Sequence, residues 1–238
     1  MDDLEDFVMR RTPSADRPLL GMTVLVVEDS RFACEAIRLL CLRSGARIRR
    51  ADALASARRH LRVYRPSVVI VDMGLPDGSG TELIAELAEA PARVPVLLGT
   101  SGSDNLAEDA MSAGADGFLV KPVETLSVFQ EAILRHLPRE AQPTGPRALS
   151  QEVLEPDDMA LMDDLSHVGD LLDKKSDEKT LDYVAQFLGG VARSARDKKL
   201  GLIVRTLADH RASGTDTAKD VKALRALLKD RLGRAAIV

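Results

Sequence analysis

The chain has 238 residues, of which 45% are hydrophobic and 29% are charged, and its formal net charge is −4. This length is ample for a packed core and leaves room for one large or two small domains. The mild acidity argues against a protein that coats nucleic acid over its whole surface, although it leaves room for a local basic patch.

From residue 23 onward, short apolar runs alternate with helical patterns. The expected strands cover 23–27, 46–50, 67–72, 94–100 and 116–120, and the expected helices cover 31–45, 52–64, 80–90, 104–114 and 123–137. The central strands are almost wholly apolar, as strands are when helices cover both faces of a sheet. Five strand–helix units in alternation predict an α/β fold with a doubly wound, five-stranded parallel sheet. In such folds, ligands bind beyond the carboxyl ends of the strands.

Polar residues follow four of the predicted strands at that edge. They are Glu28 and Asp29 after the first strand, Asp72 in the third, Thr100 and Ser101 at the fourth, and Lys121 with Pro122 after the fifth. Adjacent carboxylates repel each other beside a core, and three in one crevice make a site for a hard cation such as Mg²⁺. Asp29 or Asp72 alone is equally well explained as a helix cap. The arrival of all these groups at one edge favours a site.

Residues 23–138, about half the chain, resemble the receiver domain of bacterial two-component response regulators. The resemblance rests on ED after the first strand, VDMGLPDGSG after the third, GTS after the fourth and GADGFLVKP around the fifth. It implies a flavodoxin-like receiver fold and a phosphorylation-dependent signalling switch. Such a switch is not an enzyme with an external substrate, because it promotes only its own phosphorylation and dephosphorylation.

The resemblance also implies a phosphoacceptor and a metal site. Asp72 would accept a phosphoryl group from a sensor histidine kinase or a phosphotransfer protein. Mg²⁺ would be bound by Asp29, Asp72 and the main-chain carbonyl of Gly74, with Glu28 acting through water. A carboxylate that attacks phosphorus needs neutralised charge and alignment, and a metal site at this point meets the first need.

Three further roles follow from the resemblance. Thr100 would donate a hydrogen bond to one phosphoryl oxygen and Lys121 would pair with another, which adds a directional donor and a positive charge. Phe118, together with Thr100, would form the conformational switch, although a half-buried strand residue is an alternative explanation for Phe118. The Lys121–Pro122 bond would be cis.

Two glycines flank the expected phosphoryl site. Gly74 lies two residues after Asp72, and Gly102 lies two after Thr100. In the family these positions carry variable side chains that shield the acyl phosphate or place the attacking water. Their absence either relaxes loop geometry or opens the phosphoryl face to water. We expect rapid loss of the phosphoryl group unless the C-terminal segment covers it.

The domain organisation follows from composition. Residues 1–21 form a polar lead-in, 22–138 the receiver domain, 139–151 a linker rich in proline, and 152–238 a helical output or dimerisation domain of three to four helices. Residues 152–192 carry 3 basic and 11 acidic side chains, whereas 193–238 carry 12 and 5. These opposite charges can be solvated, pair within a bundle, or pair across a dimer.

Three functions compete for the whole chain. The first is an adaptor whose helical domain forms a homodimer or binds a protein partner. The second is a transcription regulator whose basic helices bind DNA, which is less favoured because no clear DNA-binding motif is visible. The third is a phosphorelay intermediate or phosphatase in which His167 is a second phosphoacceptor, although a lone histidine on a helix is more often structural. A phosphohydrolase of the haloacid dehalogenase type is disfavoured because it needs an aspartate where Gly74 stands.

The expected location is the cytoplasm. The N-terminal MDDLEDF is acidic and lacks the apolar core of a signal peptide, and no apolar run approaches the length of a membrane span. Cys34 and Cys41 lie seven residues apart, outside any metal-binding spacing, and are expected to be buried thiols of a reducing compartment.

Overall fold

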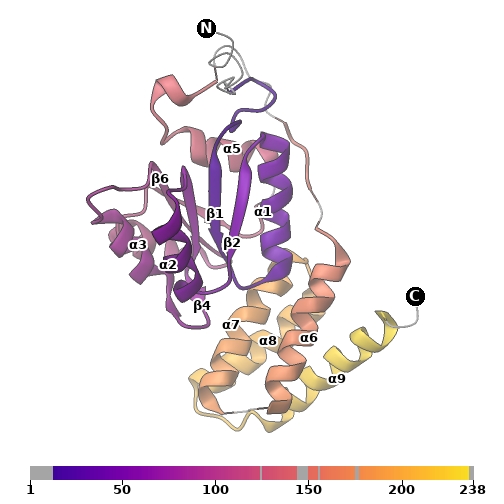
Figure 1. Ribbon diagram of the computed structural model, residues 1–238. Coiled ribbons are helices and arrows are strands. Elements are labelled where there is room, and N and C mark those ends of the chain that lie inside the picture. The colour runs from indigo at the N-terminus through magenta and orange to yellow at the C-terminus, as the bar shows by residue number, and fades with distance from the viewer. Residues whose placement is uncertain (1–12, 124, 144–149, 155, 175–176, 236–238) are drawn as a thin grey trace, which may run out of the picture.

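The computed structural model describes residues 13–123, 125–143, 150–154, 156–174 and 177–235, and Figure 1 shows a sheet with flanking helices above a helical bundle. The main sheet contains β1 (Thr23–Val27), β2 (Arg47–Ala51), β3 (Val68–Asp72), β6 (Val96–Ser101) and β7 (Gly117–Val120). All its pairings are parallel, in the order β2-β1-β3-β6-β7. The predicted fold class is confirmed. A short antiparallel hairpin, β4 (Gly74–Leu75) and β5 (Gly78–Ser79), was not predicted.

Helices cover both faces of this sheet. They are α1 (Arg31–Ser44), α2 (Leu54–Val63), α3 (Gly80–Ala88), α4 (Ala107–Ser112) and α5 (Leu126–Leu134). Alternate residues of β1 point to opposite faces, so that Val24 and Val26 pack with α1 and α5 while Leu25 and Val27 pack with α2 and α3. Each such buried aliphatic side chain contributes about 1.5–3 kcal/mol. The two-sided burial explains the uninterrupted apolar strands.

The polypeptide before β1 and after α5 also packs on the sheet domain. Leu19, inside the expected lead-in, is fully buried in the core, whereas residues 1–12 lie outside the described residues. The amides of Leu126 and Ser127 donate to the carbonyls of Glu152 and Ser150, so the connecting segment runs beside the start of α5. That segment leads to the carboxyl edge of the sheet.

Four helices follow in the C-terminal region: α6 (Asp158–Lys174), α7 (Glu178–Ser194), α8 (Lys198–Ala212) and α9 (Ala218–Ala235). They share one apolar core, whose fully buried members include Leu165, Val168, Val184, Leu188 and Leu224. In Figure 1 the bundle lies below the sheet, next to the carboxyl ends of its strands. Within the described residues, no helix has the length and apolar character needed to cross a membrane.

The oppositely charged halves of the bundle pair with each other. Arg211 Nε lies 2.8 Å from Asp182 Oδ1, and Arg225 Nε lies 4.0 Å from Asp173 Oδ1. Pairing within the bundle therefore accounts for part of the charge asymmetry, without a partner chain.

Candidate functional site

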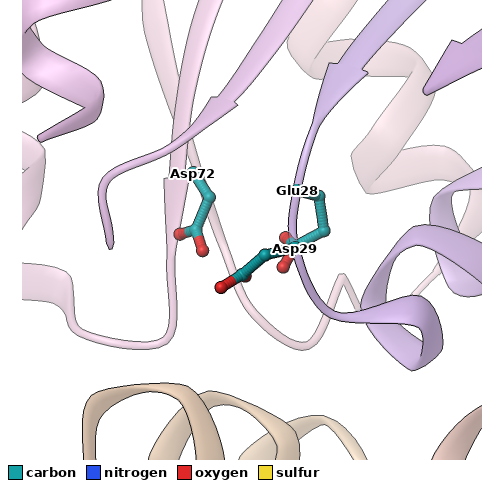
Figure 2. A group of neighbouring side chains, drawn as sticks. All are labelled: Glu28, Asp29 and Asp72. Atoms are coloured by element: carbon teal, nitrogen blue, oxygen red, sulfur yellow. The ribbon is translucent and has the colours of Figure 1, made fainter. Parts of the chain in front are cut away.

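Three carboxylates meet at the carboxyl edge of the sheet. Glu28 and Asp29 follow β1, and Asp72 is the last residue of β3, the strand paired with β1. One oxygen from each lies within 4.8 Å of the others, and Figure 2 shows the Asp29 and Asp72 carboxylates directed toward one another. Glu28 is 1% exposed and Asp72 8% exposed. The predicted acidic cluster thus exists and is largely withdrawn from water.

This cluster is electrostatically strained. Burial, with smaller contributions from Asp72 and Asp29, raises the pKa of Glu28 to about 8, although Lys121 opposes the shift. Burial, followed by the charge of Asp72, raises the pKa of Asp29 to about 6. Both shifts mean that the negative charges are costly as they stand. A cation among the three carboxylates would relieve that cost.

Lys121 supplies the positive charge nearest the cluster. It follows β7, precedes a cis peptide bond to Pro122, and is 8% exposed. Its Nζ lies 2.5 Å from Glu28 Oε2 and 3.1 Å from Asp72 Oδ2. Burial alone would lower the pKa of Lys121, but the charges of Asp72 and Glu28 outweigh it and raise the pKa. Lys121 therefore stays protonated and is bound to both carboxylates.

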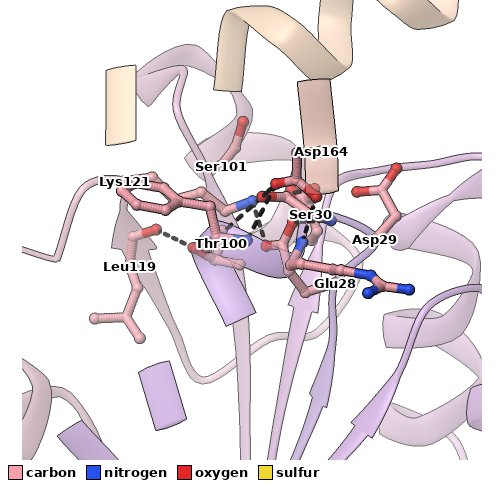
Figure 3. Close-up of polar contacts among 12 residues, drawn as sticks. Glu28, Asp29, Ser30, Thr100, Ser101, Leu119, Lys121 and Asp164 are labelled. Carbon is pink, nitrogen blue, oxygen red and sulfur yellow. Dashed lines mark hydrogen bonds and ion pairs between the residues drawn. The ribbon is translucent and has the colours of Figure 1, made fainter. Parts of the chain in front are cut away.

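The two residues of the expected switch face away from the cluster. Thr100 in β6 is fully buried, and its Oγ1 donates to the carbonyl of Leu119 at 2.7 Å, as Figure 3 shows. Phe118 is half-buried against the core cluster that contains Ala110, and its ring lies close to Gly99. To donate to a phosphoryl group, the Thr100 hydroxyl would have to give up its bond to Leu119.

Helix α7 occupies the space over both flanking glycines. A Cβ built on Gly74 would overlap the amide of Gln186, and one built on Gly102 would overlap the guanidinium of Arg193. A cavity of about 40 Å³ is lined by the three carboxylates and Lys121 from the strand ends and by Gln186 and Arg193 from α7. The strand side provides no side chain at these two positions, as the sequence predicts. Side chains of the helical bundle cover them instead.

Asp164 of α6 anchors the bundle to the start of α1. Its carboxylate accepts from Ser30 Oγ at 2.7 Å, from Arg31 N at 2.8 Å and from Phe32 N at 3.1 Å, and it is 2% exposed. It thereby caps the first turn of α1, where the helix dipole favours negative charge. Burial raises the pKa of Asp164, and the bond from Ser30 partly offsets this rise. Figure 3 shows Asp164 beside Ser30.

A second contact reaches the acidic cluster itself. The hydroxyl of Tyr183 in α7 donates to Asp29 Oδ2 at 2.8 Å. Burial and the charge of Asp29 raise the pKa of Tyr183, so the phenol remains a donor.

The sequence analysis did not identify four residues of the bundle that lie at this site: Asp164, Tyr183, Gln186 and Arg193. Asp164 lies three residues after Leu161, on the apolar stripe of its helix, where an unpaired carboxylate would be costly. Tyr183, Gln186 and Arg193 lie at spacings of three and seven, which place them on one face of α7. These spacings predict that the three residues share a face of the helix. They do not indicate that this face contacts the sheet domain.

His167 does not line the small cavity among the carboxylates. It is exposed on α6, and its ring lies 6.1 Å from that of Phe187. It lines a larger neighbouring cleft of about 980 Å³, which also contains Asp29 and His60.

Comparison with known proteins gives one family match. The response regulator receiver domain matches residues 24–133, a range that ends within α5 and before the helical bundle. The KDP operon transcriptional regulatory protein KdpE of Escherichia coli K12 is 31% identical over 116 residues, which cover 48% of this chain and 52% of KdpE. The virulence transcriptional regulatory protein PhoP of Salmonella typhimurium 14028s is 32% identical over 118 residues, with the same two shares. The chain spans about half the length of these curated relatives.

Partial matches among solved structures include a chemotaxis response regulator and the receiver domain of a sensor histidine kinase. The chemotaxis response regulator CheY4 of Vibrio cholerae has a TM-score of 0.45 and 22% identity, covering 49% of this chain and 98% of that chain. The receiver domain of the sensor histidine kinase PA1611 of Pseudomonas aeruginosa, with a magnesium ion in its active-site cleft, has a TM-score of 0.44 and 23% identity. Its match covers 48% of this chain and 96% of that chain.

Proposed function

Because residues 24–133 form a response regulator receiver domain, we propose that this protein is a signalling switch that accepts a phosphoryl group on Asp72 in a Mg²⁺-dependent reaction. The donor is a sensor histidine kinase or a phosphotransfer protein. The observation that carries the proposal is the position of Asp72, whose carboxylate lies 3.1 Å from Lys121 Nζ within a cluster of three carboxylates at the carboxyl edge of the sheet. Phosphorylation then changes the contacts of the helical bundle that rests on this edge.

The donor set fits Mg²⁺. Oxygens bound to one octahedral Mg²⁺ lie about 3–4 Å apart, and the carboxylate oxygens here lie within 4.8 Å before any ion draws them together. Asp29 and Asp72 with the Gly74 carbonyl would bind it directly. Glu28, already paired with Lys121, would act through water. When bound, the metal neutralises negative charge on the carboxylates and on the incoming phosphoryl group.

In the transfer itself, a carboxylate oxygen of Asp72 forms a bond to phosphorus. The bond from phosphorus to the donor histidine nitrogen breaks, and that nitrogen keeps the electron pair. Lys121, held beside Asp72, moves from the carboxylates to a phosphoryl oxygen. Thr100 exchanges its bond to the Leu119 carbonyl for a bond to another phosphoryl oxygen, which couples the chemistry to β7.

The output is best supported as a protein contact through the bundle, either with a second copy of the chain or with another protein. Two observations bear on DNA binding. Basic side chains such as Arg211 and Arg225 are paired with acidic ones inside the bundle. The matched family range ends before the bundle begins, so the DNA-related names of KdpE and PhoP carry no information about it.

The test is phosphorylation of the full chain by acetyl phosphate and Mg²⁺, followed by intact-mass analysis. We expect one phosphoryl group on the wild type and none on Asp72→Asn, which keeps the shape of the side chain but removes the nucleophilic charge. Asp104→Asn, an exposed carboxylate near the same edge, is the matched control and should react normally. Continued phosphorylation of the Asp72→Asn chain, for instance on His167, would contradict the proposal.

A further inference from the structure

Two positions beside the phosphoacceptor lack side chains, and one helix fills both. Gly74 begins β4 and Gly102 directly follows β6, and the side chains of Gln186 and Arg193 stand where their Cβ atoms would project. Neither glycine has a positive φ, so the backbone does not require glycine at these places. The spaces are instead taken by residues from the helical bundle.

Within the part of the chain that the structure describes, the guanidinium of Arg193 forms no ion pair. Among the described residues it has no hydrogen-bonded or ion-pair partner, in contrast to Arg211 and Arg231 of the same bundle, which pair with Asp182 and Asp197. Its guanidinium lies against Gly102 and lines the cavity that contains Asp72. The planar guanidinium of Arg193 fits an acceptor that offers two oxygens side by side, such as a phosphoryl group.

Its electrostatic environment supports the same interpretation. Partial burial and the neighbouring charge of Arg205 lower the pKa of Arg193, whereas Asp72 and Asp104 act in the opposite direction. Lys121 pairs with Glu28 and Asp72, so Arg193 would add a second positive charge beside the phosphoryl group rather than replace that of Lys121. A phosphoryl group on Asp72 would add about two negative charges within reach of Arg193.

We propose that α7 completes the phosphoryl site: Arg193 binds the phosphoryl group on Asp72 and Gln186 covers it, in place of the side chains that Gly74 and Gly102 lack. This inference rests on the proposed phosphorylation of Asp72. The bundle then tightens on the phosphorylated receiver and protects the acyl phosphate. Hydrolysis requires water to form a bond to phosphorus in line with the breaking bond to Asp72, which releases inorganic phosphate and the free carboxylate. Gln186 and Arg193 line the cavity that contains Asp72, so they would limit the access of that water.

The experiment measures the decay of the phosphorylated full chain. Wild type, Gln186→Ala, Arg193→Ala and Arg193→Lys are phosphorylated with acetyl phosphate and Mg²⁺, the donor is removed, and the remaining phosphoprotein is followed by intact mass. We expect Arg193→Ala and Gln186→Ala to shorten the half-life roughly fivefold to tenfold, and Arg193→Lys to fall in between. Lys179→Ala removes one positive charge from the exposed surface of the same helix and should decay like wild type.

A compensating variant separates a role at the phosphoryl site from a role in bundle packing. Gly102→Arg combined with Arg193→Ala fills the vacated space with the Cβ of the new arginine and offers its guanidinium to the cavity from the strand side. We expect it to recover most of the lost half-life, which repair of packing alone would not do. Equal or longer half-lives in Arg193→Ala, Arg193→Lys and Gln186→Ala, with each chain fully phosphorylated, would overturn the inference while leaving the proposed function intact. A wild type that takes no phosphoryl group would overturn the proposed function first.

Discussion

At the scale of single residues, Asp29 has two competing uses. In the structure it accepts a hydrogen bond from Tyr183 at 2.8 Å, and in the proposed function it binds Mg²⁺. Without the ion, its charge is disfavoured by burial and by Asp72, so its pKa rises from 3.8 to about 6. A carboxylate that destabilises the metal-free fold is expected where binding of a ligand matters more than stability.

This conflict predicts a pH-dependent effect of Asp29→Asn. The folded wild type holds the Asp29 proton more tightly than the unfolded chain does, so its free energy of unfolding falls as pH rises from about 4 to about 6. Asn keeps an acceptor for Tyr183 but carries no charge. In EDTA, we expect the variant to be more stable than wild type by about 1–2 kcal/mol at pH 7.5 and nearly equal to it at pH 4.

Urea unfolding at the two pH values checks this prediction. Added Mg²⁺ should stabilise the wild type and have little effect on the variant, because the variant lacks a ligand. The same stability difference at both pH values would show that the Asp29 charge is not the cause.

At the scale of elements, the first turn of α1 is capped by a carboxylate from the helical bundle. Ser30 caps Ala33 within the helix, but the amides of Arg31 and Phe32 donate to Asp164 of α6. The capping carboxylate thus joins the first turn of α1, which directly follows the acidic pair, to the bundle. A movement of α6 is in this way linked to the segment that holds Glu28 and Asp29.

We predict that Asp164→Ala loosens this junction. The loss of the cap and of its charged hydrogen bonds should lower the free energy of unfolding by about 2 kcal/mol. Amide hydrogen exchange at Arg31 and Phe32 should become faster. The control is Asp163→Ala, which removes only an exposed pair with Arg31 and should leave both quantities nearly unchanged. Unaltered exchange in Asp164→Ala would mean that α1 does not depend on this cap.

At the scale of the whole molecule, the helical bundle lies over the edge where phosphorylation is proposed to occur. Tyr183, Gln186 and Arg193 all approach that edge from α7, and Figure 1 shows α7 below the ends of the strands. A phosphohistidine carried by a protein needs room that this arrangement does not leave, whereas a small donor needs less. The bundle would therefore have to move aside for a protein donor and return afterwards.

The predicted consequence is a dependence on donor size. Asp164→Ala, which weakens docking of the bundle, should raise the rate of phosphorylation by a phosphohistidine protein about tenfold, and the rate with acetyl phosphate much less. Asp163→Ala should leave both rates near those of wild type. Equal acceleration with both donors, or none with either, would show that the bundle does not control access.

The sequence by itself determined the receiver fold and the set of polar groups at one sheet edge. Five apolar strands alternating with amphipathic helices bury both faces of the strands in a doubly wound sheet, and parallel strands bring Asp29, Asp72 and Lys121 together at their carboxyl ends. Only the tertiary structure decided what lies over that edge. The face of α7 with Gln186 and Arg193 is polar, and a polar helix face is equally compatible with solvent, with a partner and with the receiver domain. The choice among these depends on contacts between residues far apart in the sequence, above all the capping of α1 by Asp164. Asp164 lies 133 residues away from Arg31 along the chain, and no local pattern encodes such a contact.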